Sequence, residues 1–313
     1  MSKRMPRKGK GKLAPQCPPP RFDPRLVLII ATVDVSFAAI FIRFSDAPSL
    51  IIALYRMVLS TLFLLPLLFM EGGFKAYTKL SRRNKLELLA AGFALAIHFG
   101  FWIESLKHVS VANAVILVTS HPLLIGVLSI YLLGERMAPV QWAGTGIAFA
   151  GIIVIAAGDW QAGAGEAFVG DMLALVGMVA FAVYLLVGRR LRQVCTTAAY
   201  VVPVYGVSAI VFFIAILVSN VPLTGYPVSD WSVFLALALV CTLGGHTLYN
   251  YTLGHVPAYL VSITLLGEPV LSTVFAWAIL SEVPSWFVMP GGTMVLIGIY
   301  LATAGQMTGP RRK

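Results

Sequence analysis

Residues 112–155 read ANAVILVTSHPLLIGVLSIYLLGERMAPVQWAGTGIAFAGIIVI, and residues 258–302 read AYLVSITLLGEPVLSTVFAWAILSEVPSWFVMPGGTMVLIGIYLA. The two halves align without a gap when the numbering is shifted by 147, the difference between His255 and His108. Each stretch is apolar along most of its length and long enough for two helices across about 30 Å of hydrocarbon. The pair therefore predicts a membrane protein with an internal repeat.

Residues with specific structural uses recur at the matched positions. Proline removes a backbone donor from a helix, and glycine lets helices approach closely in lipid. The matched pairs are His108 and His255, Val109 and Val256, Pro122 and Pro269, Glu135 and Glu282, Gly144 and Gly291, Gly151 and Gly298, and Gly158 and Gly305. Such matches indicate a structural repeat rather than a shared apolar composition.

The composition of the whole chain also indicates a membrane protein. Of its 313 residues, 58% are hydrophobic and 12% are charged, about half the charge of soluble domains. Ten apolar segments stand out, at 26–44, 49–69, 86–107, 110–133, 139–157, 170–188, 198–218, 231–253, 257–280 and 285–304. Each is near the 20 residues or so that a spanning helix needs. We expect an all-α polytopic membrane protein with ten transmembrane helices.

The net charge of +10 comes mostly from a basic tail at residues 1–25. Its bases are Lys3, Arg4, Arg7, Lys8, Lys10, Lys12, Arg21 and Arg25. The tail is rich in Pro and Gly and has no periodicity, so we expect it to be disordered. A cytoplasmic topology anchor explains the charge without any nucleic-acid partner; an arm that binds lipid or a protein partner is the alternative.

The connections between the segments alternate in charge. Lys and Arg gather at 70–85, 134–138 and 189–197 and at the C-terminus. The connections at 158–169 and 219–230 carry acids and no base, with Arg43 and Lys107, both at helix ends, as the exceptions. By the positive-inside rule both termini are cytoplasmic, which requires an even number of spans. We expect an integral protein of the cell (inner) membrane.

Each half of the chain contains five predicted spans. We place the first repeat at 26–157 and the second at 170–305. An odd number of spans turns the second repeat upside down relative to the first. Inverted repeats have two nearly equivalent packings, each open to one side, which is a physical route to alternating access. The pattern therefore favours a secondary transporter.

Motifs for other kinds of chemistry are missing. The chain has no Walker A loop, HExxH, CxxC pair or GxSxG elbow. The wide spacing of Cys17, Cys195 and Cys241 suits no metal site. We expect no enzyme activity, no cofactor and no metal.

The two quoted stretches resemble the EamA-type transporters of the drug/metabolite transporter superfamily. The pattern is a Pro within a helix, a Glu at its end and a Gly-rich helix next. In the first half these are Pro122, Glu135 and Gly144 with Gly151, and the second half repeats them 147 residues later. The Arg of the family's second helix matches Arg56 in ALYRMVLS. His121, where members more often carry a small or polar residue, and Val283, in place of a base, depart from the family.

The resemblance implies ten helices in a basket, a central cavity, and export of amino acids, metabolites or drugs. We expect a small-molecule substrate, most simply an amino acid or a similar metabolite. A drug or nucleotide-sugar carrier, or a membrane enzyme or scaffold, remains an alternative. The glycine rows predict close packing within each repeat, with a dimer face as the alternative, so the protein is a monomer or a homodimer.

Ionisable residues within the predicted spans are the first candidates for the site, because a charge in hydrocarbon is costly. Asp34, Glu268 and its repeat mate His121 lie near the middle of their spans. They suit a protonatable or substrate-contacting set in a wet cavity; an internal ion pair or hydrogen bond is the structural alternative. Arg56 can hold a substrate carboxylate with two hydrogen bonds. A pair with Asp34, or a charge that snorkels to the membrane surface, is the alternative.

Prolines and polar faces complete the candidate set. Pro122 and Pro269 directly follow His121 and Glu268, and each frees a carbonyl, at residues 118 and 265, for a ligand or a hinge. A static kink is the alternative. Helix faces with polar and aromatic residues predict cavity-lining positions. They carry His98, Trp102, His246, Tyr249 and Asn250, with Tyr184 and Tyr205 as further candidates. For each aromatic residue taken singly, ordinary packing or an interfacial belt is the alternative.

Overall fold

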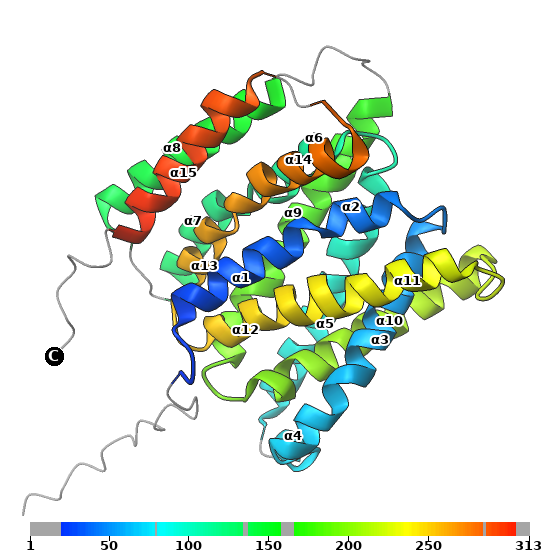
Figure 1. Cartoon of the computed structure of the whole chain (residues 1–313). Helices are drawn as coiled ribbons and strands as arrows, with labels where there is room; N and C mark the ends of the chain where they lie inside the picture. Colours follow the sequence, from blue (N-terminus) through cyan, green and yellow to red (C-terminus); the bar gives the residue numbers. More distant parts are fainter. Residues whose placement is uncertain (1–19, 79, 134–136, 158–165, 284–285, 305–313) are drawn as a thin grey trace, which may run out of the picture.

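In the computed structural model, all regular secondary structure of the described residues is helical (Figure 1). The described residues are 20–78, 80–133, 137–157, 166–283 and 286–304. Residues 1–19 of the predicted basic tail, Glu135, Gly158 and Gly305 lie outside them.

The helices follow one another through short connections. They are α1 (Pro24–Ser36), α2 (Ala38–Arg43), α3 (Ser49–Met70), α4 (Lys75–Thr78), α5 (Arg82–Ser105), α6 (Val111–Val118), α7 (His121–Leu133), α8 (Pro139–Ala157), α9 (Glu166–Leu191), α10 (Thr197–Ser219), α11 (Val228–Ala236), the π-helix η1 (Leu237–Thr247), α12 (Leu248–Leu253), α13 (Ala258–Thr264), α14 (Gly267–Leu280) and α15 (Val288–Ala304).

Within the described residues, seven helical segments are long and apolar enough to cross a membrane. They are Pro24–Arg43, Ser49–Met70, Arg82–Ser105, Phe168–Leu191, Thr197–Ser219, Val228–Leu253 and Ala258–Leu280. Two shorter apolar helices, Pro139–Val154 and Met289–Leu301, lie in the predicted fifth and tenth segments. The predicted fourth segment is divided between α6 and α7. The chain is thus an integral, polytopic helical protein, and the count of ten spans stays a prediction.

Side-chain caps determine where several helices begin. The hydroxyl oxygens of Ser81, Ser110 and Thr196 accept hydrogen bonds from backbone N–H groups three residues later, at the starts of α5, α6 and α10. These caps satisfy donors that a helix N-terminus leaves without an intrahelical partner. The helices therefore begin at residues that local sequence marks clearly.

The two prolines lie at breaks between helices rather than within continuous helices. Pro122 is the second residue of α7, and Pro269 is the third residue of α14. A proline in the first turn of a helix removes a donor that has no intrahelical partner there. The carbonyls that we expected to be free are also occupied. Nδ1 of His121 lies 3.1 Å from the Val118 oxygen, and the Leu265 oxygen accepts from the Glu268 backbone N–H at 2.9 Å.

The π-helix η1 widens the segment that contains the predicted polar face of the eighth span. Its hydroxyls bond to carbonyls five residues earlier: Thr242 Oγ1 donates to the Leu237 oxygen at 3.0 Å, and Thr247 Oγ1 to the Thr242 oxygen at 3.0 Å. Gly244 and Gly245 lie within this helix, against α1. A side-chain Cβ at 245 would lie 2.3 Å from Val35 Cγ1, so the glycine permits the close approach. π-helical turns are rare and occur often at functional sites.

The most extensive helix contacts are those of α8 with α15, α5 with α9, α3 with α10, α5 with α10, and α1 with η1. The α8–α15 pair lies at one side of the bundle (Figure 1). We expected each glycine row to pack within its own repeat, but α8 and α15 pack against each other. A Cβ at Gly298 would lie 2.5 Å from the Gly144 oxygen, and one at Gly151 would lie 2.5 Å from the Gly291 oxygen. Glycine is therefore needed on both helices.

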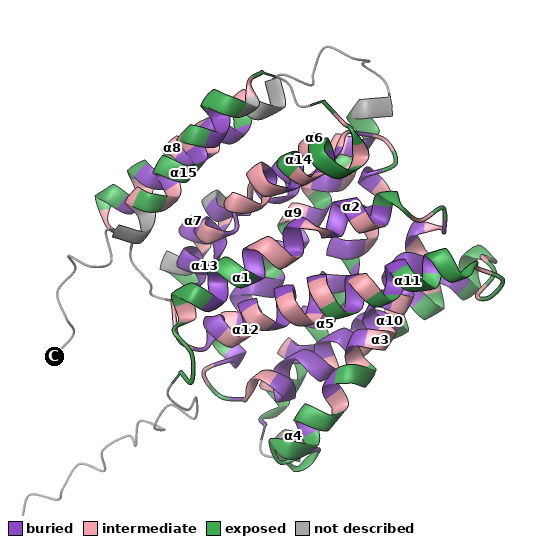
Figure 2. Ribbon diagram, viewed as in Figure 1, coloured by how far each residue is buried: buried purple, intermediate pink, exposed green. Residues whose placement is uncertain are grey.

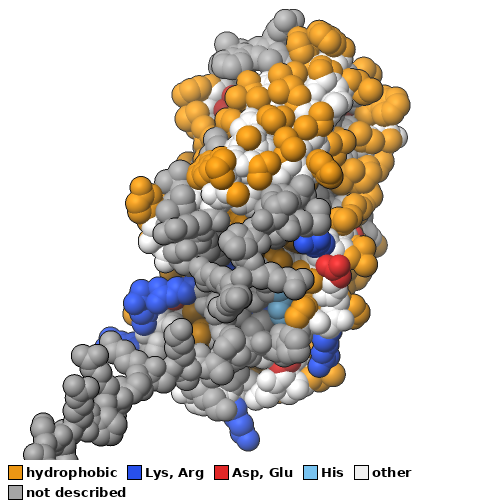
Figure 3. Space-filling model, turned by 90° about the vertical axis from the view of Figure 1, so that its left-hand side faces the viewer, with side chains coloured by type: hydrophobic (Ala, Val, Ile, Leu, Met, Phe, Trp, Pro, Cys, Tyr) orange, Lys and Arg blue, Asp and Glu red, His pale blue; other side chains and the backbone are white. Residues whose placement is uncertain are grey.

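Burial follows the pattern of a helical bundle in lipid. Buried residues concentrate on the inward faces of the helices, and exposed residues follow the outward faces (Figure 2). On the face in Figure 3, hydrophobic side chains cover the upper part, and Lys and Arg lie in the lower part. Many large apolar side chains are exposed, among them Leu62, Ile153, Ile214 and Leu296. Such a surface is stable only against hydrocarbon.

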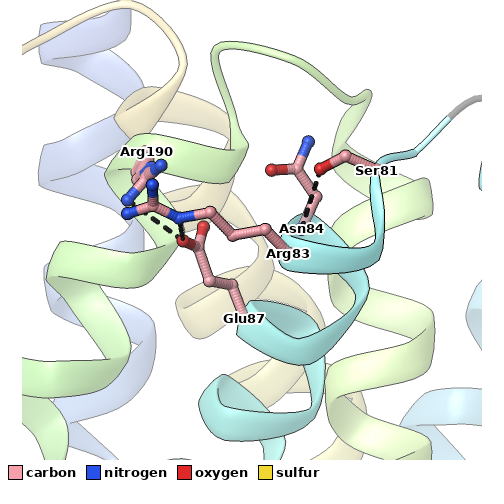
Figure 4. Close-up of polar contacts among 5 residues, drawn as sticks. All are labelled: Ser81, Arg83, Asn84, Glu87 and Arg190. Carbon is pink, nitrogen blue, oxygen red and sulfur yellow. Dashed lines mark hydrogen bonds and ion pairs between the residues drawn. The ribbon is translucent and has the colours of Figure 1, made fainter.

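A charged cluster links α5 and α9 at the base-rich connections. The Glu87 carboxylate lies 3.0 Å from Arg83 Nε and 3.0 Å from Arg190 Nη1 (Figure 4). Arg190 belongs to the C-terminal turn of α9, where a cation also interacts favourably with the helix dipole.

Candidate functional site

A cavity lies among the helices of both halves of the chain. Its volume is about 20 Å³, which is room for about one water molecule. Its lining residues are Val35, Ala38, Arg56, His98, Trp102, Val118, Thr119, His121, Phe181, His246, Tyr249 and Glu268. The lining thus combines apolar and aromatic walls with a few polar groups, as is typical of small-molecule sites.

Arg56 of α3 is a fully buried cation in this lining. Its Nε donates a hydrogen bond to Thr242 Oγ1 at 2.8 Å, and its guanidinium carbon lies 4.0 Å from the centre of the Phe99 ring. Among the described residues, neither Nη1 nor Nη2 has a hydrogen-bond partner. Since these two nitrogens form the edge that binds a carboxylate with two hydrogen bonds, the buried cation is available for an anion.

His121 and Glu268 lie at the two helix breaks and both line the cavity. Because the Val118 carbonyl can only accept, the contact with His121 Nδ1 requires a proton on that nitrogen. In the neutral imidazole, Nε2 is then an acceptor, and it has no partner among the described residues. The two helix breaks therefore place the acceptor nitrogen of His121 and the partly buried carboxylate of Glu268 at the cavity.

Aromatic rings form much of the cavity wall. His98 and Trp102 are parallel, with an interplanar angle of 1° and centroids 6.2 Å apart. Phe181 lies 4.6 Å from the His98 ring and 4.7 Å from the His121 ring, measured between centroids. His246 packs edge-on against Phe99 of α5. Flat aromatic walls of this kind suit the apolar part of a small organic solute.

Several buried polar atoms of the cavity residues have no partner among the described residues. Besides the two Arg56 nitrogens and His121 Nε2, they are Trp102 Nε1 and His246 Nδ1. Buried polar groups in proteins are normally hydrogen-bonded, so each such atom needs an explanation. Their convergence on one cavity indicates that a polar ligand or water satisfies them.

The remaining predicted site residues lie outside this lining. A Cβ at Gly244 would lie 2.3 Å from Asp34 Oδ2, so the Asp34 carboxylate packs directly against η1. Asn250 Nδ2 donates to Tyr184 Oη and, at 2.6 Å, to the His246 oxygen. The Tyr205 hydroxyl lies 3.2 Å from Thr247 Oγ1. Tyr184, Tyr205 and Asn250 are buried, whereas Asp34 is half-buried. Tyr205 lies on α10, which contributes no residue to this lining.

Two aromatic residues at the site carried no signal of their own in the sequence. Phe99 packs against Arg56, and Phe181 contacts the rings of three histidines. A phenylalanine in an apolar helix resembles any other core residue. The repeat could have indicated both phenylalanines, because their repeat mates are candidate site residues. A shift of 147 matches Phe99 to His246, and Phe181 to Asp34.

Comparisons with known proteins agree with this architecture. A solved structure covers 91% of this chain and 99% of its own, with a TM-score of 0.73 and 21% identity, which shows a shared fold. An Archaeoglobus fulgidus protein, named as an uncharacterized transporter, is 26% identical over 87% of this chain and 93% of its own. The pseudopaline exporter of Pseudomonas aeruginosa is 24% identical over 87% of this chain and 93% of its own. The riboflavin transporter of Brucella anthropi is 25% identical over 85% of this chain and 91% of its own.

The family model of the EamA-like transporters matches the chain twice, at residues 25–157 and 168–304. The two matches together contain every residue that lines the cavity. The chain therefore belongs to the EamA-like transporter family and is a membrane transporter.

Proposed function

We propose that this transporter is a secondary exporter of amino acids or similar small metabolites that works by alternating access. The observation that carries the proposal is the buried Arg56 edge, which lines a cavity and has no protein partner among the described residues. Arginine binds carboxylates with two parallel charged hydrogen bonds, which are stronger than neutral ones. A substrate carboxylate would therefore satisfy both nitrogens.

Glu268 offers the complementary charge in the same cavity. The ion pairs of the described residues do not join it to Arg56, whose one hydrogen bond goes to Thr242. A substrate with both an anionic and a cationic group would pair with both residues, and the aromatic walls would contact its apolar part. We propose Arg56, His98, Trp102, His121, His246, Tyr249 and Glu268 as substrate-contacting or coupling residues.

We propose ten spans in two inverted five-helix repeats, at 26–157 and 170–305. The packing supports this arrangement, because the shift of 147 places α1 on α9, and α5 on the segment 228–253 that contains η1. The α5–α9 contact thereby corresponds to the contact of η1 with α1. The breaks correspond too, since the shift moves His121, at the start of α7, onto Glu268, at the start of α14. A symmetric pair of breaks suits a hinge at Pro122 and Pro269.

We further propose that both termini lie in the cytoplasm and that the protein resides in the cell (inner) membrane. The bases at 70–85 and 189–197 support this orientation. The α8–α15 contact occupies the glycine rows within one chain, which favours a monomer over a dimer built on those rows.

Flux into and out of proteoliposomes tests the proposed function. The purified chain would be reconstituted, and the movement of radiolabelled L-alanine, L-leucine, L-phenylalanine, L-glutamate and L-lysine would be compared with protein-free vesicles. We expect saturable flux of at least one of them, and a loss of that flux in Arg56→Gln. Movement of nucleotide sugars or cationic drugs, with none of the amino acids, would instead establish the alternative substrate classes.

A further inference from the structure

We infer that Thr242 is a positioning residue for substrate binding, because it orients the guanidinium of Arg56 from the π-helix η1; the inference rests on the proposed role of Arg56 as the carboxylate anchor. Thr242 is fully buried and lies outside the cavity lining. It acts through Arg56 rather than by contact with substrate.

The direction of the hydrogen bonds at Thr242 follows from the atoms involved. A hydroxyl has one hydrogen to donate and lone pairs that accept. The Thr242 hydroxyl donates its hydrogen to the Leu237 carbonyl at 3.0 Å, because that carbonyl can only accept. Its oxygen is then free to accept from Arg56 Nε at 2.8 Å. The hydroxyl is thus set as an acceptor that points at the inner edge of the guanidinium.

The π-helical register makes this arrangement possible. The Thr242 donor bond spans five residues, which is the hydrogen-bond spacing of a π-helix. In an α-helix, a threonine hydroxyl bonds to the carbonyl three or four residues earlier, which turns it along the helix in a different direction. The wider helix therefore presents an acceptor toward α3 at the depth of Arg56.

Two contacts hold the Arg56 guanidinium, one on its face and one at Nε, and together they determine where the edge formed by Nη1 and Nη2 points. Phe99 packs on its face at 4.0 Å, and Thr242 holds Nε. The guanidinium is planar, so these contacts direct Nη1 and Nη2, the two nitrogens without a partner, along the remaining edge. Without Thr242 the group can rotate about its stem, and a carboxylate would lose one of its two hydrogen bonds in part of the population.

Transport kinetics of Thr242→Val test the inference, because valine keeps the shape and removes the hydroxyl. The probes are the five amino acids named above, each with its amide counterpart, which lacks the carboxylate. We expect KM for the transported acid to rise about ten-fold, as for a lost hydrogen bond to a charged group. The maximal rate should change less than KM. The preference for the acid over its amide should fall, because only the acid loses affinity. Thr242→Ser restores the hydroxyl and should restore both values.

Thr247→Val is the matched control. The Thr247 hydroxyl also donates to a carbonyl five residues earlier in the same π-helix, but it does not bond to Arg56. This variant should leave the acid-to-amide preference unchanged. Thr242→Ala serves if the valine variant does not yield folded protein, as judged by size-exclusion chromatography. An unchanged preference in Thr242→Val, or an equal loss in Thr247→Val, would overturn the positioning role. Wild-type protein that moves none of the five amino acids refutes the proposed substrate class and, with it, this inference.

Discussion

The guanidinium carbon of Arg56 lies 4.0 Å from the centre of the Phe99 ring, and both side chains are fully buried. The electron-rich ring face partly offsets the loss of water around this face of the cation. The relationship links α3 to α5 beside the cavity and leads to a prediction about stability.

Phe99→Leu should lower stability beyond the loss of packing, because leucine has no ring face for the cation. Phe212 of α10 is a similarly buried phenylalanine, and the described cation contacts do not include it. Phe212→Leu therefore measures the packing loss alone. We expect Phe99→Leu to exceed it by about 1–2 kcal/mol, the value of a desolvated cation–π contact. Thermal unfolding in detergent measures both, and equal losses would contradict the prediction.

Glu268→Gln keeps the side-chain shape and removes the charge at the cavity. Flux should fall about ten-fold or more, since a hydrogen bond to a charged group contributes roughly 1.5–3 kcal/mol. The pH dependence of flux should also weaken, because glutamine, unlike glutamate, cannot take up or release a proton. Glu104→Gln is the control, as Glu104 pairs with Lys107 at a helix end, at 3.4 Å. Unchanged flux with an unchanged pH profile would leave Glu268 with a packing role only.

Single-cysteine labelling tests the predicted orientation in a background without Cys17, Cys195 and Cys241. A cysteine at Thr78, which is exposed in the base-rich 70–85 connection, should react with a membrane-impermeant thiol reagent only after the membrane is opened. A cysteine at Val228, which is 81% exposed, should react from outside intact cells. Labelling of position 78 from outside would refute the cytoplasmic placement of that connection.

Gly298→Ala should weaken the contact of α15 with α8. The added Cβ would lie 2.5 Å from the Gly144 oxygen and from the Ala148 nitrogen, both backbone atoms that cannot move aside alone. Overpacking of this kind typically costs about 1–3 kcal/mol. Gly146→Ala, on the open side of α8, meets no atom within 4 Å and should be neutral or slightly stabilising. Melting temperatures of the two variants distinguish them, and equal values would contradict the role of Gly298.

We expect His255 to make the stability of the protein depend on pH. It lies between the spans that end at Leu253 and begin at Ala258. Burial lowers its pKa below the ordinary value, and the positive charges of Arg192 and Arg189 lower it further. The unfolded chain therefore takes up the proton first, and stability is lost as the pH falls through the unfolded pKa of about 6.5. His255→Gln should lose less melting temperature than wild type between pH 7.5 and 5.5; equal losses would contradict the prediction.

The sequence determined the helical membrane fold and its family, for reasons that are local. Runs of apolar residues near 20 in length have no stable place except in lipid, and the second quoted stretch repeats the spacing of the first. Arg56, Glu268 and His121 were recognisable because a charge or an imidazole within such a run is costly and needs a cause. Pro122 and Pro269 marked the helix breaks, although they lie in the first turns of new helices.

The tertiary structure alone decided which of these residues meet. Asp34 and Glu268 looked equivalent in the sequence, yet Glu268 lines the cavity while Asp34 packs on Gly244. The contacts of Arg56 with Phe99 and Thr242 join residues 43 and 186 positions apart. The π-helix η1, which carries Thr242, packs against α1 and α3. Such contacts depend on rotation and depth between helices, which packing fixes and hydropathy does not encode.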